Sequence, residues 1–240
     1  GYSDADAYAE GDGDSTANAY ANENVVTVTG GSRVGDDVYG GYSDADAYAT
    51  ANAYANENVV TVSGGSIVDD DVYGGYSAAA AYAEGDGDAT ANAYANNNEV
   101  VVSEEAVVHG DIYGGYADAY FADINSEQAN NNTVIIDGAT VGTGRTIAGG
   151  AIYVDKVSDR HNATYNTVSI RGNYSLNDVS LYGGYNVGSE GPLQEDDLFT
   201  GNTLNLDARQ VGNTVVDVVK NFETINIQAG EIANGGTVLD

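Results

Sequence analysis

Asn24-Val-Val-Thr-Val28 is the first copy of a phrase that decides the fold of this chain. The phrase has the pattern Asn-x-apolar-x-apolar, and further copies begin at Asn58, Asn98, Asn132, Asn166 and Asn202. Successive copies are 34, 40, 34, 34 and 36 residues apart. A fixed period in this range is typical of stacked units, none of which can bury its apolar face alone. Function is therefore expected on a surface made by repetition rather than in a single pocket.

A second phrase, apolar-Tyr-Gly-Gly-Tyr, precedes a strict alternation of small and polar residues. It occurs at Val38–Tyr42, Val72–Tyr76, Ile112–Tyr116 and Leu181–Tyr185. In the second repeat, Ala then occupies every odd position from 45 to 55. A period of two indicates a β-strand with one buried face. Ala is a poor strand former, and an Ala-rich helix is the competing interpretation, but the segment has no 3.6-residue pattern.

These phrases predict an all-β fold, a parallel β-solenoid with repeats of about 34 residues. Each repeat is expected to contain an alternating small-residue strand, a Val/Ile strand, a Gly-rich turn and the Tyr-Gly-Gly-Tyr segment. One repeat forms either one wide coil or two narrow turns. Stacking places equivalent residues in columns about 4.8 Å apart, and amide ladders and aromatic stacks stabilise such arrangements. The expected structural ladders comprise Asn24, Asn58, Asn98, Asn132, Asn166 and Asn202, together with Tyr39, Tyr42, Tyr73, Tyr76, Tyr113 and Tyr116.

Two repeats are longer by six residues, through the inserts Glu10–Ser15 and Glu84–Ala89. Because six is even, later side chains keep their face of the sheet. Each insert either extends its strand or bulges as a loop whose ends rejoin in register.

The regularity of the repeats divides the chain into three parts. Residues 1–116 carry the regular repeats, 117–200 carry degenerate ones, and 201–240 form a terminal set of short strands or a cap. Gly1-Tyr2 aligns with Gly41-Tyr42, so we expect the chain to begin inside a repeat.

Composition restricts the partners of this chain. Its formal net charge is −30, with seven Lys and Arg residues against 37 Asp and Glu residues. Such a chain repels nucleic acid and anionic membranes, and no run of 18 apolar residues predicts a membrane-spanning helix. Cations are the natural small ligands, with calcium first because oxygen ligands are abundant.

Carboxylates at repeated positions are the candidate calcium ligands. Stacked carboxylates repel one another unless they are exposed, protonated or bridged by a cation. A solvated acidic face that keeps the protein soluble is the competing interpretation, and the pattern matches neither the EF-hand nor the nonapeptide calcium repeat. The candidates are Glu10, Asp12, Asp14, Glu84, Asp86, Asp88, Asp37, Asp71 and Asp111.

Catalytic motifs are not evident in the sequence. His109 and His161 lie in different repeats without a nucleophile motif, and no Gly-Lys-Ser/Thr phosphate loop occurs. No unique carboxylate pair stands out for glycoside cleavage. The protein is therefore expected not to be an enzyme and to have no cofactor apart from the candidate calcium. The 19 Tyr residues either seal the outer sheet or form an adhesive face, and the two roles are compatible.

The phrases Asn-Thr-Val-x-Ile, Gly-Gly and Val-Tyr-Gly-Gly-Tyr together resemble the passenger-domain repeats of Gram-negative autotransporter adhesins, which use type V secretion. The tail, with Gly201–Leu206 and Val218–Ile227, is similar to the stretch that those passengers carry close to their outer-membrane domain. The resemblance covers most of the chain. It implies a surface-exposed β-solenoid stalk with roles in adhesion, aggregation or biofilm formation.

The expected function is thus a non-enzymatic, extracellular structural and adhesive protein at the bacterial cell surface, associated with the outer membrane. Its expected partners are ligands on host or neighbouring cells, or copies of itself. The first alternative is a subunit of a self-assembling fibre that stacks head to tail. The second is a β-helix enzyme that acts on polysaccharide.

Overall fold

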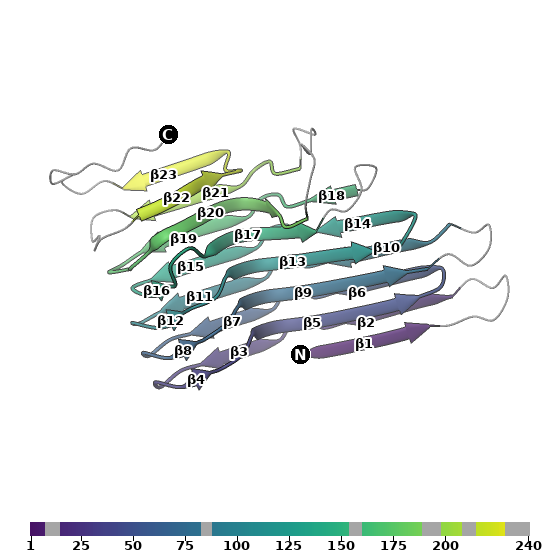
Figure 1. Ribbon diagram of the computed structural model, residues 1–240, viewed down its shortest axis with the longest axis horizontal. Helices are drawn as coiled ribbons and strands as arrows, with labels where there is room; N and C mark the ends of the chain where they lie inside the picture. Colours follow the sequence, from purple (N-terminus) through teal and green to yellow (C-terminus); the bar gives the residue numbers. More distant parts are fainter. Residues whose placement is uncertain (8–14, 83–87, 154–159, 189–197, 208–214, 229–240) are drawn as a thin grey trace.

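The described chain folds into a parallel β-solenoid (Figure 1). The computed structural model describes residues 1–7, 15–82, 88–153, 160–188, 198–207 and 215–228. These residues form strands and turns without any helix. The strands build four parallel sheets, here called A to D. The all-β solenoid predicted from the repeats is confirmed.

Sheet A has seven strands: β1 (Tyr2–Ala7), β5 (Val38–Ala47), β9 (Val72–Ala81), β13 (Ile112–Tyr120), β17 (Thr146–Tyr153), β20 (Asn177–Asn186) and β22 (Val215–Lys220). Sheet B has five: β2 (Thr16–Tyr20), β6 (Thr50–Tyr54), β10 (Thr90–Tyr94), β14 (Ile124–Gln128) and β18 (Arg160–Asn162). Sheet C has seven: β3 (Val25–Val28), β7 (Val59–Val62), β11 (Glu99–Ser103), β15 (Thr133–Asp137), β19 (Thr167–Arg171), β21 (Thr203–Asp207) and β23 (Thr224–Gln228). Sheet D has four: β4 (Arg33–Val34), β8 (Ile67–Val68), β12 (Val107–Val108) and β16 (Thr140–Val141).

Each repeat makes one wide coil, and the first four coils visit sheets A, B, C and D in turn. Within the described residues, the later coils have no strand in sheet D, and those after β18 have none in sheet B. Tyr42 pairs with Tyr76, which is its equivalent one repeat later. This register settles the choice between one coil and two turns. The seven strands of sheet A therefore stack over roughly 29 Å at the usual strand spacing.

The alternating Ala stretch is not one strand, as the sequence suggested, but two. It turns at Tyr48-Ala49, so β5 lies in sheet A and β6 in sheet B. Both strands direct their alanines inward, because the alternation continues in phase through the corner. The Tyr-Gly-Gly-Tyr segment is the first half of the same ten-residue strand β5.

The core consists of two compartments with different side chains. Between sheet B and the later half of sheet A lies an almost pure alanine cluster, of which Ala53, Ala79 and Ala93 are fully buried. The second compartment is filled mainly by Val and Ile side chains from sheet C, from sheet D and from the start of the sheet A strands. Examples are Val100, Val108 and Ile112. The first compartment is therefore filled mainly by single methyl groups, and the second mainly by branched side chains.

A column of asparagines lies where the two compartments meet. The Oδ1 atom of Asn98 accepts the main-chain N–H of Asn58 at 2.9 Å and its side-chain N–H at 3.1 Å. Asn98 in turn donates its main-chain N–H and its side-chain N–H to the Oδ1 atom of Asn132. The column contains all six asparagines expected from the repeat: Asn24, Asn58, Asn98, Asn132, Asn166 and Asn202.

The Gly-Gly pair makes room for this column. A Cβ atom on Gly75 would lie 2.2 Å from the carbonyl oxygen of Ala55 and 2.6 Å from Nδ2 of Asn98. On the other side of Asn98, the chain enters its strand through Asn97, which has a φ of 58°. Asn tolerates this left-handed conformation better than most residues do. The Asn-x-apolar-x-apolar phrase and the Tyr-Gly-Gly-Tyr phrase therefore pack against each other, with the asparagine of one on the glycines of the other.

The six-residue inserts leave the ladders in register. Ala7 pairs with Ala47 before the first insert, and Thr16 pairs with Thr50 after it. Most of both inserts lies outside the described residues, so the choice between a longer strand and a loop stays open. In the tail, β21, β22 and β23 continue sheets C and A, and all of β23 is exposed.

Candidate functional site

The outer face of sheet A carries two columns of stacked tyrosines. In the first column, the ring centroids of Tyr39, Tyr73 and Tyr113 are 4.9 and 5.2 Å apart. The second column comprises Tyr2, Tyr42, Tyr76 and Tyr116, with centroids 4.9 to 5.0 Å apart. Rings of the two columns meet edge to face, at interplanar angles between 81° and 89°. The outer face of sheet A in the first four coils, with both columns, is here called the tyrosine face.

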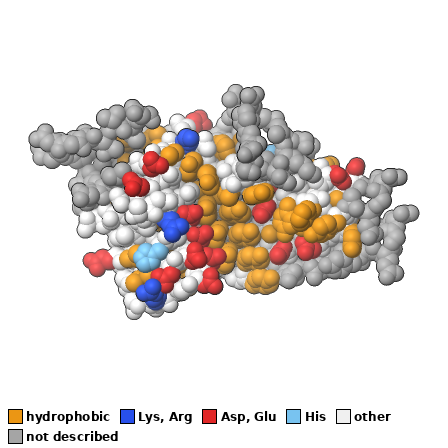
Figure 2. All heavy atoms as spheres, in the orientation of Figure 1, with side chains coloured by type: hydrophobic (Ala, Val, Ile, Leu, Met, Phe, Trp, Pro, Cys, Tyr) orange, Lys and Arg blue, Asp and Glu red, His pale blue; other side chains and the backbone are white. Residues whose placement is uncertain are grey.

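The space-filling view shows the tyrosine face as a band of apolar and aromatic side chains crossed by acidic ones (Figure 2). Tyr73 and Tyr113 are buried by their neighbours, whereas Tyr42, Tyr76 and Tyr116 are partly exposed. Both columns give way to alanine in the fifth coil, where Ala148 and Ala151 occupy the equivalent positions. In this face, Tyr73 and Tyr113 of the first column pack against their neighbours, while the second column reaches solvent.

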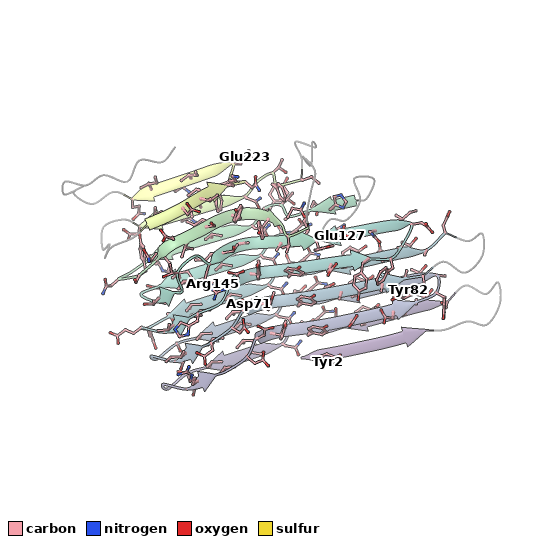
Figure 3. The ribbon with its side chains drawn as sticks, viewed as in Figure 1. Tyr2, Asp71, Tyr82, Glu127, Arg145 and Glu223 are labelled. Atoms are coloured by element: carbon pink, nitrogen blue, oxygen red, sulfur yellow. The ribbon has the colours of Figure 1, made fainter. Side chains whose placement is uncertain are left out.

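Asp37, Asp71 and Asp111 form a carboxylate column beside the first tyrosine column (Asp71 is labelled in Figure 3). Asp71 accepts the main-chain N–H of Asp111 through Oδ1 at 2.7 Å and the hydroxyl of Tyr73 through Oδ2 at 3.0 Å. Asp37 and Asp111 make the same pair of contacts in their coils. Each carboxylate of this column thus accepts one main-chain N–H and one tyrosine hydroxyl.

The packing shifts the pKa values of both partners upward. Burial raises the pKa of the Asp71 carboxyl above its usual 3.8, and the charges of Asp111 and Asp37 add to the effect. Burial, followed by the charge of Asp71, also raises the pKa of Tyr73 well above its ordinary value. The hydroxyl of Tyr73 therefore remains a neutral hydrogen-bond donor to Asp71 at physiological pH.

We predict that Asp71→Asn is more stable than the native chain at pH 7. A carboxyl whose pKa is raised on folding binds its proton more tightly in the folded state, so the free energy of unfolding falls as pH rises past its ordinary pKa. The amide removes this penalty, and its oxygen can still accept the N–H of Asp111. Urea unfolding at pH 4 and pH 7 should show a larger gain at pH 7, with Asp70→Asn as the exposed neighbour for comparison. A loss of stability at pH 7 would instead mean that the hydrogen bonds of the carboxylate outweigh its desolvation.

A second set of acidic residues, here called the acidic margin, borders the other tyrosine column. It consists of Asp44, Asp46 and Asp118. Asp44 and Asp118 occupy the same register position two coils apart, with Ala78 between them. After burial, the charge of Asp118 is the largest cause of the raised pKa values of Tyr76 and Tyr116. The tyrosine face thus lies between two rows of carboxylates.

Of the other candidate calcium ligands, Glu10, Asp12, Asp14, Glu84 and Asp86 lie outside the described residues. Asp88 is described and exposed. The described acidic residues that do converge are Asp36, Asp37 and Asp70, whose carboxylate oxygens lie within 4.8 Å of one another. Only Asp37 of these was among the expected ligands.

We expect Asp36, Asp37 and Asp70 to bind calcium weakly, with a dissociation constant of about 10⁻⁴ to 10⁻³ M, because exposed carboxylates hold the ion with little preorganisation. Calorimetric titration should show the binding, and Asp36→Asn/Asp70→Asn should abolish it. The matched control is Glu104→Gln/Glu105→Gln, which removes the same charge from another turn. Tight binding that survives the aspartate substitutions would move the calcium site to another part of the chain.

The two histidines lie in different settings. His109 Nδ1 is 3.1 Å from Asp69, a carboxylate that also pairs with Arg33 on the surface. His161 Nδ1 is 2.9 Å from Glu127, and both side chains are almost fully buried (Glu127 is labelled in Figure 3). Sequence reasoning missed this buried pair. The register Ala93–Glu127–His161 in sheet B could have signalled it, because charged residues replace the alanine of the earlier coils.

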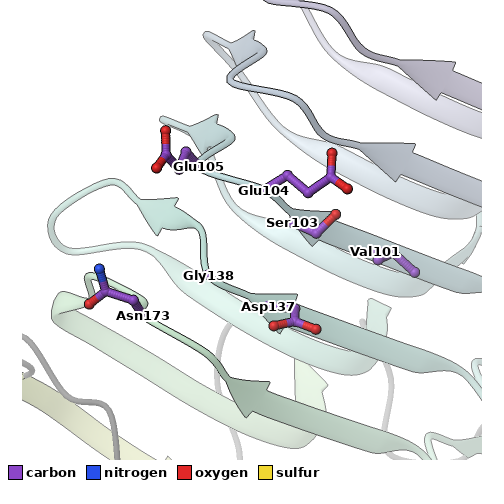
Figure 4. A pocket seen from close by; sticks show the side chains of 7 residues that line it. All are labelled: Val101, Ser103, Glu104, Glu105, Asp137, Gly138 and Asn173. Carbon is purple, nitrogen blue, oxygen red and sulfur yellow. The ribbon is translucent and has the colours of Figure 1, made fainter.

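A shallow hollow lies at the corner between sheets C and D (Figure 4). It is lined by Val101, Ser103, Glu104, Glu105, Asp137, Gly138 and Asn173. Asp137 is already paired with Arg171 at 2.8 Å, and Glu104 and Glu105 lie on an exposed turn with positive φ. The hollow therefore offers neither an enclosed cavity nor an obvious acid–base pair.

Comparison with protein-family models, with curated proteins and with solved structures finds no match for this chain. Within the described residues, no helix is long and apolar enough to cross a bilayer.

Proposed function

We propose that this chain is a non-enzymatic structural and adhesive protein of the bacterial surface, forming part of the β-solenoid stalk of an autotransporter-like adhesin. One observation carries the proposal. The same tyrosine and aspartate side chains recur at the same outer positions coil after coil, as in Tyr42–Tyr76–Tyr116 and Asp37–Asp71–Asp111. A surface of this kind makes many equal contacts along its length, as adhesion requires, whereas catalysis requires one unique site.

The charge and the packing support an extracellular contact role. The net charge of −30 opposes binding to nucleic acid and keeps solvated rods apart. The hydrogen-bonded columns of asparagine, aspartate and tyrosine run along the stacking direction and brace it. The proposed partners are ligands on host or neighbouring cells, or further copies of the chain.

Attachment of coated beads tests this proposal. Beads carrying the chain through one end should adhere to cell monolayers or to one another more than beads carrying an unrelated acidic globular protein of similar charge. Equal behaviour of the two bead types would contradict an adhesive role. Release of sugar from a glycan panel, lost on carboxylate substitution, would favour the polysaccharide-acting enzyme.

Negative-stain electron microscopy separates the stalk from the fibre alternative. Isolated short particles, in calcium and in chelator alike, are expected for a stalk segment. Long filaments would instead support head-to-tail assembly.

A further inference from the structure

We propose that the tyrosine face binds extended chains of a cationic, β-1,4-linked amino-sugar polymer, such as deacetylated chitin. This inference rests on the adhesive function proposed above and names the chemical class of its ligand. It combines three features of the face: its charge, the spacing of its rings and the arrangement of its acidic margin.

The charge of the face calls for a cationic partner. Strands β5, β9 and β13 contain no Lys, Arg or His. Carboxylates border the tyrosines on both sides, with Asp37, Asp71 and Asp111 along one edge and the acidic margin along the other. An ammonium group is attracted to carboxylates, to which it donates hydrogen bonds. Polyanions are repelled by the same surface.

The spacing of the rings favours a sugar chain over a peptide. Ring centroids within the two columns recur every 4.9 to 5.2 Å. The pyranose repeat of an extended β-1,4-linked chain is close to this distance, so successive sugars would meet successive tyrosines. An extended peptide advances about 3.3 Å per residue, which brings side chains to one face about every 6.6 Å. A peptide therefore falls out of register with the coils within a few residues.

From the second coil to the fourth, the acidic margin matches the alternation of an extended β-1,4 chain. Successive sugars in such a chain are turned over, so amino groups point to the same side only at every second residue. Asp44 and Asp118 share one register position two coils apart, and neutral Ala78 lies between them. In the first coil, Asp4 is paired with Asp44, so the alternation begins at Asp44. The corresponding separation is about 9.6 Å, which is twice the strand spacing. Amino groups of alternate sugars would thus face the acidic margin, while those in between point to the opposite side of the sugar chain.

Titration of the native chain with fluorescently labelled sugar hexamers at pH 6 tests this inference. The deacetylated hexamer is expected to bind at least tenfold more tightly than the fully acetylated hexamer, which has the same spacing without the charge. Asp44→Asn/Asp118→Asn is expected to weaken binding of the deacetylated hexamer at least tenfold. The native Ala78 indicates that a neutral residue is tolerated in this column, and the unfolding midpoint of the variant checks that it folds.

The matched control is Glu57→Gln/Glu99→Gln, which removes the same charge from exposed positions outside sheet A. We expect it to change binding less than twofold. Equal losses in the two double variants would overturn the inference in favour of general charge attraction. A lysine hexamer that binds as tightly as the amino-sugar hexamer would overturn it in favour of a cationic peptide.

The bead experiment separates failure of this inference from failure of the proposed function. Beads that adhere to cells or to one another, carrying a chain that does not bind the deacetylated hexamer, would remove the amino-sugar ligand and leave the adhesive role. Hexamer binding lost in Asp44→Asn/Asp118→Asn, with bead adhesion lost in the same variant, would support both.

Discussion

Replacing Gly75 by alanine is expected to destabilise the fold by at least about 3 kcal/mol, at the upper end of overpacking costs. The new Cβ would lie 2.2 Å from the main-chain carbonyl oxygen of Ala55, which belongs to the preceding coil and cannot rotate away as a side chain could. It would also reach Nδ2 of Asn98, in the asparagine column. Urea unfolding followed by circular dichroism would measure the loss, and failure of the variant to fold would agree with it.

Gly35→Ala is the control for this substitution. No atom lies within 4 Å of a Cβ built on Gly35, and its φ is not in the left-handed region. We expect a change within about 0.5 kcal/mol, as for most surface substitutions. Similar losses at Gly75 and Gly35 would show that glycine matters for chain flexibility rather than for the space it leaves.

Replacing Asn98 by alanine is the second substitution with a large expected effect. Asn98 is 1% exposed, and its Oδ1 atom accepts two N–H groups of Asn58. Alanine would leave both donors buried without that acceptor, at about 1–3 kcal/mol each. We therefore expect a loss of about 2–5 kcal/mol, measured as a shift of the urea midpoint.

Asn92→Ala provides the comparison within the same coil. Asn92 donates to Asn52 at 2.8 Å in a ladder on the outer face of sheet B, where Asn52 also donates to Asn18. Solvent can replace these bonds, so we expect less than about 1 kcal/mol. An Asn98→Ala variant as stable as Asn92→Ala would mean that the buried column does not hold the coils together.

The sequence predicted the stacking of the chain better than the path of a single coil. Because equivalent residues of a solenoid lie in columns, the repeat period alone predicts that Asn58 stacks on Asn98 and that Tyr42 stacks on Tyr76. The corner at Tyr48-Ala49 was not predicted, since the alternation of small and polar residues is the same before and after it. Periodicity reports which face a side chain occupies, but it does not report where a strand changes sheets.

The candidate site was predictable in its members but not in its contacts. Asp71 was recognised as part of a column, and repulsion between stacked carboxylates suggested calcium. The hydrogen bonds from the main chain of Asp111 and from Tyr73 could not be read from spacing, because they depend on how the strand enters sheet A. The buried pair of Glu127 and His161 was missed because residues 117–200 were described only as degenerate repeats, and their register with the earlier coils was not followed position by position.

The corner between sheets A and B has a consequence for protein engineering. The first coil holds six more residues than the second between the paired positions Ala7/Ala47 and Thr16/Thr50, and the third coil again holds six more than the second. The register of the columns is the same on both sides of this corner. Repeats of this chain therefore already differ in length at the corner without a change in strand pairing. We expect a foreign peptide with an even number of residues, placed at Tyr48-Ala49, to leave the ladders intact. Peptides inserted there in several coils would form a row along one edge of the solenoid. The distance between coils would then set the spacing of the inserted epitopes or enzymes.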